Sequence, residues 1–151
     1  MSEAGTYVYV TYIRATQEKV WAHLTTPEFT REYWFGTTAE SEFRAGSPWK
    51  LTSADGTLTD SGEILEADPP RRLVIKWRNE FKPELKAEGW SRCVMELEQA
   101  DGAVKLTITH ALEQPRPNAK LIEAVSGGWP KVLSNLKSVL ENGKPALGKA
   151  Y

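Results

Sequence analysis

The clearest helical pattern in the sequence lies near its end, in Ser126-Gly127-Gly128-Trp129-Pro130-Lys131-Val132-Leu133-Ser134-Asn135-Leu136-Lys137-Ser138-Val139-Leu140-Glu141-Asn142-Gly143. Its large apolar residues recur with helical spacing: Trp129, Val132, Leu133, Leu136, Val139 and Leu140. They form one broad apolar stripe, and such a stripe needs a partner surface. Because nearly everything before it has the pattern of β-strands, we expect a sheet curved around this helix.

The two ends of this helix carry different signals. Gly143 suits the left-handed position that ends a helix, and Pro145 follows just beyond it. Toward the other end, Pro130 lacks the N–H of an interior helical bond and crowds the carbonyl of Ser126. Either the helix bends across Gly127–Pro130, or a short helix ends there and the main helix restarts with Pro130 in its first turn.

Length and composition are those of an ordinary globular chain. The 151 residues suit one domain, and we expect it to span residues 1–151. Hydrophobic residues make up 40% and charged residues 26%, and the net charge is −1. A chain without a basic excess is not expected to bind nucleic acid or an anionic membrane surface.

Cysteine usage and hydropathy bear on the compartment. A lone cysteine, Cys93, excludes an internal disulfide and suits a reducing environment. The N-terminus has no basic segment followed by an apolar run, and no stretch approaches the ~18 apolar residues of a membrane span. We therefore expect a cytoplasmic protein without membrane insertion. Six tryptophans are many for this length, and such rings line a large core or a cavity.

The first third of the chain predicts one strand and two helices. Thr6–Arg14 is rich in β-branched and aromatic residues, and apolar groups on both faces predict a strand covered on both sides. Thr16 suits the cap of a helix whose apolar face carries Val20, Trp21 and Leu24. Thr26-Pro27-Glu28 begins a second, short helix that reaches about Tyr33.

The middle of the chain predicts antiparallel strands. Their expected ranges are 37–43, 48–52, 58–66, 73–78, 90–98 and 104–111. Asp55-Gly56 and Asp101-Gly102 are hairpin turns, and Asp68-Pro69-Pro70 stops pairing. Asn79–Gly89 is polar and irregular, so we expect a loop that could act as a lid, with Gly89 as hinge. The order strand, two helices, strands and long helix predicts an α+β fold with a hollow at the helix's looser end.

Four segments in this order carry a resemblance to a known family: Lys19–Glu28, Gly62–Trp77, Leu106–His110, and Gly128-Trp129 with the helix that follows. Over nearly its whole length the chain resembles bacterial proteins similar to the C-terminal domain of the activator of Hsp90 ATPase. These belong to the START/Bet v 1-like (SRPBCC) helix-grip superfamily. The resemblance implies a curved antiparallel sheet wrapped around a long C-terminal helix, with two short helices after the first strand. It also implies a deep cavity between sheet and helix, which many relatives use for small apolar or amphipathic molecules.

The candidate cavity residues are mainly aromatic: Trp34, Phe35, Trp49, Ile64, Trp77, Phe81, Trp90, His110, Val125, Trp129 and Leu133. The alternative is that these side chains simply fill the core. So many large rings are difficult to pack densely, and buried indole N–H groups need partners, which favours a partly hydrated pocket. Arg78 and Arg92 are candidates for a clamp on a ligand carboxylate; the alternative is that they are solvated strand residues.

The sequence offers little for catalysis. His110 lies on the apolar face of its strand, but no acid or nucleophile is nominated beside it, so we expect a hydrogen-bonded wall residue. We expect His23 to face solvent or a loop, and Cys93 to be a small buried hydrophobe. With two histidines and one cysteine, neither a metal site nor a cofactor is predicted, and no hydrolase or phosphate-binding motif is present.

The sequence therefore favours non-catalytic binding of a small hydrophobic or aromatic molecule in an internal cavity. Two other classes stay open: an Hsp90-associated interaction module, which rests on the resemblance, and a cyclase- or hydrolase-type enzyme acting in the cavity. A homodimer is compatible with the sequence. The cavity should adjoin the Gly127–Pro130 turn, and Trp129 should be buried.

Overall fold

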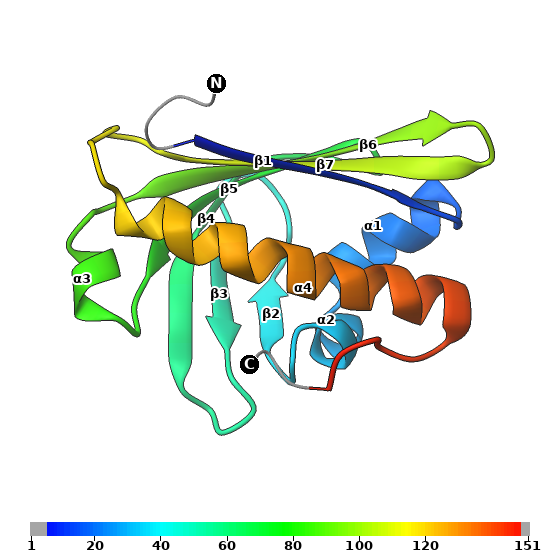
Figure 1. The fold of residues 1–151 in the computed structure, drawn as a ribbon, viewed down its shortest axis with the longest axis horizontal. Coiled ribbons are helices and arrows are strands. Elements are labelled where there is room, and N and C mark those ends of the chain that lie inside the picture. Colours follow the sequence, from blue (N-terminus) through cyan, green and yellow to red (C-terminus); the bar gives the residue numbers. More distant parts are fainter. Residues whose placement is uncertain (1–5, 149–151) are drawn as a thin grey trace.

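The structure, a computed structural model, describes residues 6–148 and contains one seven-stranded antiparallel sheet (Figure 1). The strands are β1 (Thr6–Ile13), β2 (Thr38–Ser41), β3 (Pro48–Thr52), β4 (Leu58–Asp68), β5 (Arg72–Asn79), β6 (Ser91–Ala100) and β7 (Ala103–Leu112). Their order in the sheet is β1-β7-β6-β5-β4-β3-β2, so every pair except β1 with β7 joins consecutive strands. The predicted α+β helix-grip fold is confirmed, with strand ends that differ from the expected ones by one or two residues.

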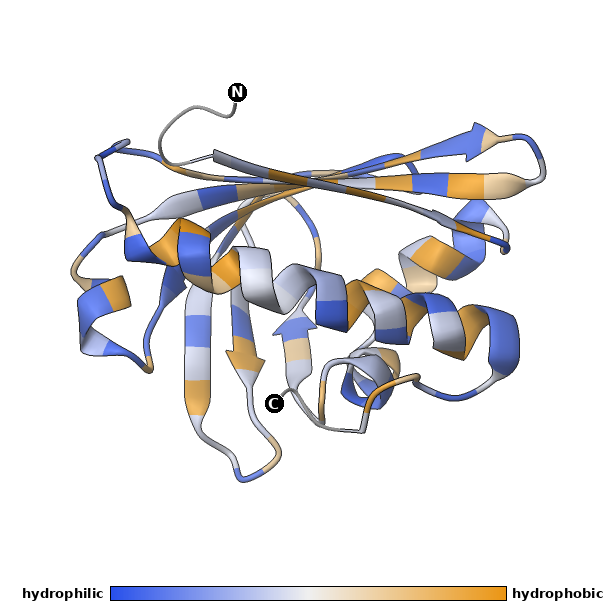
Figure 2. Ribbon diagram, in the orientation of Figure 1, coloured by the Kyte–Doolittle hydropathy of each residue, from blue (hydrophilic) through white to orange (hydrophobic). Residues whose placement is uncertain are grey.

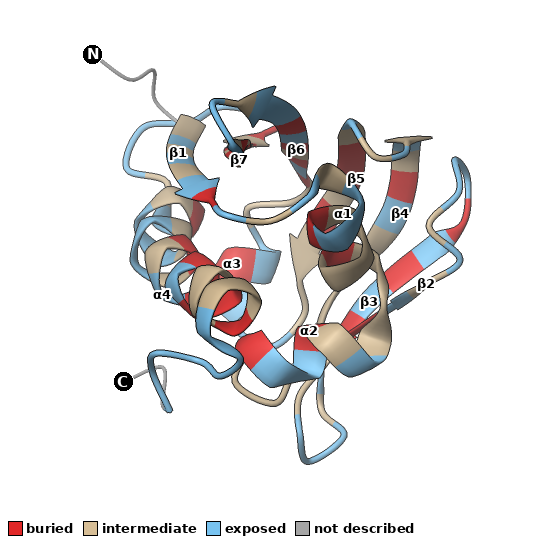
Figure 3. Cartoon of the chain, turned by 90° about the vertical axis from the view of Figure 1, so that its right-hand side faces the viewer, coloured by how far each residue is buried: buried red, intermediate tan, exposed pale blue. Residues whose placement is uncertain are grey.

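Four helices accompany the sheet: α1 (Gln17–Thr25), α2 (Pro27–Tyr33), α3 (Pro83–Lys86) and α4 (Lys120–Asn142). The strands follow an arc, with α1, α2 and α4 on its inner side (Figure 3). Helix α4 packs against β1, α2 packs against β2, and α1 packs against α2. The helices thus fill the concave face of the sheet, and the core lies between the two layers.

Alternation along the strands explains why one face is covered. In β7, Val104, Leu106, Ile108 and His110 are buried, whereas the residues between them are partly exposed. Figure 2 shows the resulting alternation of hydrophobic and hydrophilic residues along the strands. The two-residue period of a strand places every second side chain toward the helices, so one face is apolar and the other polar.

Helix α4 is continuous, so of the two alternatives the restart at Pro130 is wrong. Pro130 lies in its interior, where the missing N–H leaves one helical bond unmade. The neighbouring Trp129 and Val132 are buried on the side of α4 that faces the sheet and α2. This tertiary packing outweighs the local cost of proline. The helix ends as predicted at Gly143, whose φ of 87° is left-handed and whose N–H donates to the carbonyl of Val139 over 3.0 Å.

The structure corrects two further expectations. Strand β1 is not covered on both faces, because Val8, Val10 and Tyr12 on its outer face are 54%, 41% and 51% exposed. The segment Asn79–Gly89 is not an irregular loop throughout, since it contains the one-turn helix α3. The carboxylate of Glu88, just after α3, accepts hydrogen bonds from the first two N–H groups of α4, at 2.8 and 2.9 Å. It therefore supplies the N-terminal cap that Ala119 cannot provide.

A row of three residues crosses the centre of the sheet. Gly62 of β4 pairs with Trp49 of β3 on one side and with Trp77 of β5 on the other. The two rings contact each other with their centroids 4.4 Å apart. A Cβ at position 62 would lie 1.7 Å from the carbonyl oxygen of Lys76, so only glycine fits. Glycine here lets two indoles meet in front of the strand that separates them.

Candidate ligand-binding pocket

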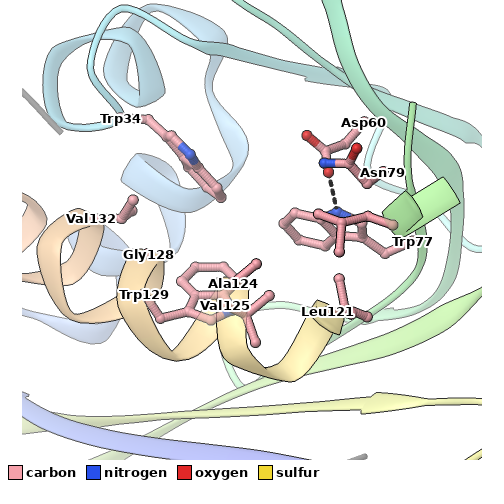
Figure 4. A pocket seen from close by; sticks show the side chains of 11 residues that line it. Trp34, Asp60, Trp77, Asn79, Leu121, Ala124, Val125, Gly128, Trp129 and Val132 are labelled. Carbon is pink, nitrogen blue, oxygen red and sulfur yellow. Dashed lines mark hydrogen bonds between the residues drawn. The ribbon is translucent and has the colours of Figure 1, made fainter. Parts of the chain in front are cut away.

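A pocket of about 230 Å³ lies between α4 and the β4–β5 part of the sheet (Figure 4). Its lining is Trp34, Asp60, Trp77, Asn79, Leu85, Leu121, Ala124, Val125, Gly128, Trp129 and Val132, and we call it the inner pocket. It adjoins the glycine-containing turn of α4, and Trp129 is only 4% exposed. Leu85 belongs to α3, so the segment expected to form a lid contributes one wall.

Three indole rings form the aromatic part of this pocket. Trp34 comes directly after α2, Trp77 from β5 and Trp129 from α4. The centroid of the Trp34 ring lies 5.4 Å from that of Trp129 and 6.2 Å from that of Trp77, and Trp77 lies 5.7 Å from Trp129. The rings of Trp34 and Trp77 each meet Trp129 edge to face, an arrangement that aromatic quadrupoles favour. The cluster therefore joins helix, sheet and the α2 corner.

His110 lies behind two of these rings rather than in the pocket lining. Its Nδ1 accepts a hydrogen bond from the indole N–H of Trp129 at 3.1 Å. The proton of the neutral ring is therefore on Nε2, which donates to Ser91 Oγ at 2.8 Å. Ser91 in turn donates to the carbonyl oxygen of Trp77 at 3.0 Å. The side chain of His110 is fully buried, and burial lowers the pKa of its imidazole to about 3.

This network argues against Ser91 and His110 as a catalytic pair. A histidine base needs an unprotonated nitrogen facing the nucleophile. Here Nε2 faces Ser91 but carries the proton, and the hydroxyl proton of Ser91 is directed to the Trp77 carbonyl. Ser91 is 1% exposed and does not line the inner pocket. The chain of hydrogen bonds instead fixes the positions of Trp77 and Trp129.

Asp60 is the charged residue of the pocket that the sequence did not nominate; Asn79, Leu85, Leu121, Ala124, Gly128 and Val132 were not among the predicted cavity residues either. It pairs with Asn79 across β4 and β5, and its Oδ2 accepts a hydrogen bond from the indole N–H of Trp77 at 2.7 Å. Burial raises the pKa of the Asp60 carboxyl, although hydrogen bonds from Trp77, Thr59 and Asn79 act in the opposite direction. A perturbed carboxyl on the wall of an apolar pocket is a typical sign of a binding site.

The sequence did contain a signal for Asp60. Ile64 is buried, so residues 60 and 62 of the same strand share its inward face. An aspartate at an inward position, two residues from a glycine, breaks the apolar alternation of the strand. Counting the parity back from Ile64 would have identified it.

A second, wider hollow of about 510 Å³ adjoins the inner pocket. It is lined by Trp34, Phe35, Thr37, Thr59, Lys82, Gly127, Gly128, Lys131 and Val132, and we call it the outer hollow. The inner pocket and the outer hollow share Trp34, Gly128 and Val132. A Cβ at Gly127 or Gly128 would meet no atom within 4 Å. The missing side chains of these glycines therefore leave open space beside both hollows.

The structure places the predicted cavity residues in three groups. The first, at the two hollows, comprises Trp34, Phe35, Trp77, Val125 and Trp129. The second group lies in the core and does not line the inner pocket: Trp49, Ile64, His110 and Leu133. The third group lies outside both hollows: Phe81, Trp90, Arg78 and Arg92.

The third group shows why closeness in sequence is a poor guide to a pocket. Phe81 is 59% exposed. The ring of Trp90 is covered by the guanidinium of Arg78, 4.4 Å from its centroid, and by the ammonium of Lys76 at 5.0 Å. Lys76 is paired with Arg92 across β5 and β6, on the face opposite to Trp77. The expected arginine clamp thus lies on the outer face of the sheet.

The remaining sequence candidates have structural contacts. Cys93 is a free, buried thiol, as expected. His23, expected to face solvent or a loop, is partly exposed and stacks on Phe29 of α2 with ring centroids 4.2 Å apart. Within residues 6–148 no group of histidine, cysteine, aspartate or glutamate has the arrangement of a metal site. None of the described helices has the length and hydropathy to cross a membrane.

Comparison with solved structures identifies the fold. A protein from Cytophaga hutchinsonii is 28% identical, covers 95% of this chain and 98% of its own, and superposes with a TM-score of 0.72. The Aha1 dimer from Colwellia psychrerythraea is 18% identical, with coverage of 92% and 98% and a TM-score of 0.71. An Hsp90 activator from Plasmodium falciparum is 20% identical, with coverage of 90% and 96% and a TM-score of 0.73.

Comparison at the level of sequence identifies the family. No curated protein matches the chain. The family model described as activator of Hsp90 ATPase homolog 1-like protein matches residues 14–141, which run from the end of β1 almost to the end of α4. This range contains the row across Gly62, the indole cluster and every residue that lines the inner pocket. The chain belongs to the family of activator of Hsp90 ATPase homolog 1-like proteins.

Proposed function

We propose that the protein binds a small apolar or aromatic molecule in the inner pocket and does so without catalysis. The observation that carries this proposal is the composition of the wall: three indoles and aliphatic side chains surround one carboxyl group, Asp60, and one carboxamide, Asn79. A fragment that buries about 200 Å² of apolar surface would gain roughly 5 kcal/mol before the cost of association. Even without that cost, 5 kcal/mol corresponds to a dissociation constant of about 0.2 mM, so dissociation constants of about 0.2 mM or weaker are expected for fragments.

Binding should be detectable through protein stability and through the indoles that line the pocket. A panel of aromatic and aliphatic fragments is titrated while the melting temperature and the tryptophan fluorescence are followed. At a concentration of about 100 times the dissociation constant, a ligand stabilises the folded state by about 2.7 kcal/mol. If no member of the panel changes either signal, the proposal is wrong.

A variant on α4 tests the location of binding. Gly128→Leu places a side chain in the open space shared by the two hollows, and we expect at least a tenfold loss of affinity. Ser134→Leu is the matched control, because Ser134 lies exposed on the same helix and lines neither hollow. Equal affinity of the two variants would place the binding site elsewhere.

A second candidate function is contact with an Hsp90 chaperone, which the family match favours. The proteins from Colwellia psychrerythraea and Plasmodium falciparum are named Aha1 and Hsp90 activator, respectively. The test is the ATPase rate of a bacterial Hsp90 with and without the protein, with a pull-down beside it. An unchanged rate without enrichment excludes this function.

Two attributes complete the proposal. A cytoplasmic location is supported by the reduced, buried thiol of Cys93. A homodimer is supported by the dimeric relative from Colwellia psychrerythraea, and sedimentation of the purified protein tests it. A sedimentation coefficient of a monomer at all concentrations would exclude the dimer.

A further inference from the structure

Among the residues that the structure describes, Asp60 has no cationic partner. No ion pair of the described residues includes it. The charged group that acts on it electrostatically is Glu80, which has the same sign. Glu80 itself is paired with Arg78 at 2.8 Å and with Lys86 at 3.1 Å, so these two cations are already engaged.

The environment of Asp60 makes this lack of a partner costly. The carboxyl lies on the wall of a mostly apolar pocket, and its hydrogen bonds, from Trp77, Thr59 and Asn79, come from neutral donors. An ionised carboxylate in such a place loses hydration that a neutral N–H only partly replaces. Consistent with this, burial raises the pKa of Asp60. A cation that entered the pocket would pair with the carboxylate and so remove this desolvation cost. The same ion pair would bind the cation in the pocket.

The direction of Asp60 makes it available to a ligand. In Figure 4 its second oxygen lies on the side that faces Trp34, away from the bond to Trp77. The rings of Trp34 and Trp77 line the same space, and indole faces attract cations. Lys82 and Lys131 line the outer hollow but not the inner pocket, so the described lining of the inner pocket carries no positive charge.

These observations discriminate between head groups of a ligand. An anion would meet the charge of Asp60 and be repelled. A neutral hydroxyl would gain one hydrogen bond but leave the partly buried charge of Asp60 uncompensated. A protonated amine would donate a charge-assisted hydrogen bond and neutralise the carboxylate at the same time. The amine therefore gains most from this wall.

We propose, on the basis of the function proposed above, that the inner pocket binds a small molecule with an apolar or aromatic body and a protonated amine that pairs with Asp60. Asp60 is then the residue that determines the specificity of the pocket. The volume of about 230 Å³ suits a single-ring amine of this class.

Three probes that share one ring and differ in charge test this proposal: 2-phenylethylamine, 2-phenylethanol and 3-phenylpropionate. Their dissociation constants are measured by calorimetric titration at neutral pH. We expect the amine to bind at least tenfold more tightly than the alcohol, and the carboxylate to bind most weakly. In Asp60→Asn the affinity for the amine should fall at least tenfold, while the affinity for the alcohol changes by less than threefold.

Glu63→Gln is the matched control, since Glu63 lies in the same strand, is exposed and does not line the pocket. It removes the same charge and should leave all three affinities unchanged. Near-ultraviolet circular dichroism verifies that both variants are folded, and the ranking of the probes on the unchanged protein decides the matter even if Asp60→Asn fails to fold.

The outcomes separate this inference from the function on which it rests. If the alcohol binds as tightly as the amine, the role of Asp60 is refuted while apolar binding stands. The same holds if Asp60→Asn keeps the preference for the amine. If none of the probes binds to the unchanged protein, both proposals fail.

Discussion

His110 shows how much one residue can be constrained by its partners. Its two ring nitrogens contact Trp129 and Ser91, and both contacts require the neutral ring protonated at Nε2. The apolar parity of its strand predicted burial, and the lack of a nearby acid predicted a hydrogen-bonded wall residue. The identity of the partners could not be predicted, because Trp129 and Ser91 come from other elements, 19 residues away in each direction.

Acid should destabilise the protein through His110. Burial lowers the pKa of this imidazole from 6.5 to about 3, so between these values the unfolded chain binds a proton that the folded chain does not. The contribution of His110 to the free energy of unfolding is therefore complete above pH 6.5. It falls as the pH drops below 6.5, by at most about 1.4 kcal/mol per pH unit. Glu80, whose pKa is lowered from 4.5, reduces the free energy of unfolding further only below about that pH. Asp60, whose pKa is raised, acts in the opposite direction and partly offsets the loss of stability in acid.

The measurement is urea unfolding between pH 6.5 and about pH 5, together with NMR titration of the two imidazoles. One imidazole should stay neutral over the whole range. The variant His23→Gln assigns the signals, since it leaves His110 as the remaining histidine. A His110 signal that titrates near pH 6.5 would contradict the buried network.

Gly62 is the second residue whose role is set by neighbours. In Gly62→Ala the new Cβ would lie 1.7 Å from the Lys76 carbonyl oxygen and 3.3 Å from the Cα of Trp77. Since both are backbone atoms, the β4–β5 pair must shift, and we expect a loss of at least about 3 kcal/mol. Urea denaturation measures it, and a loss below about 1 kcal/mol would show that the strands yield easily.

Element-level signals were stronger than residue-level ones. Strand parity predicted that Trp77 faces inward. The next residue, Arg78, must then face outward, so the sequence already argued against Arg78 as part of a clamp on a ligand in the pocket. Trp90 also shares its outward parity with Arg92. In contrast, α3 covers only four residues, and nothing in the composition of Asn79–Gly89 separates such a turn from a loop.

Helix α4 shows where local propensity fails. Gly127, Gly128 and Pro130 left two alternatives, a bend or a restart, and the continuous helix excludes the restart. Propensities of individual residues amount to a few kcal/mol, and the burial of Trp129, Val132 and the following stripe exceeds this. The sequence does not show how much packing each turn of a helix will receive.

The glycines inside α4 should therefore lower the stability of the protein relative to alanine, because the helical backbone does not need glycine at these positions. In Gly127→Ala the new Cβ meets no atom within 4 Å, and we expect a gain of about 0.5–1 kcal/mol, or roughly 1–4 °C in melting temperature. Gly143→Ala is the control, because φ of 87° strains any residue with a Cβ, and it should lower the melting temperature. Differential scanning calorimetry measures both, and a lower melting temperature for Gly127→Ala would refute the argument.

The molecule as a whole is held together by its continuous sheet and by α4. Helix α4 contacts β1 at one edge of the sheet, α2 near the other edge, and α3 at its own beginning. No part of the described chain has a core separate from these contacts except the small cluster of Leu85, Leu112 and Leu121 beside the inner pocket. We therefore expect the described chain to unfold as one unit.

We expect one cooperative transition for the whole chain. Far-ultraviolet circular dichroism and tryptophan fluorescence should give coincident melting curves, and the calorimetric enthalpy should equal the van't Hoff enthalpy. Two separate transitions, or loss of helical signal before the fluorescence changes, would show that α4 detaches from the sheet first.

The contact between four indoles has an electronic consequence. Trp49, Trp77, Trp129 and Trp34 form a chain in which successive ring centroids are 4.4, 5.7 and 5.4 Å apart. Indoles at such separations exchange excitation energy, so light absorbed by one ring is passed to its neighbours. Energy absorbed at the centre of the sheet therefore reaches the wall of the pocket, where a bound ligand would meet it.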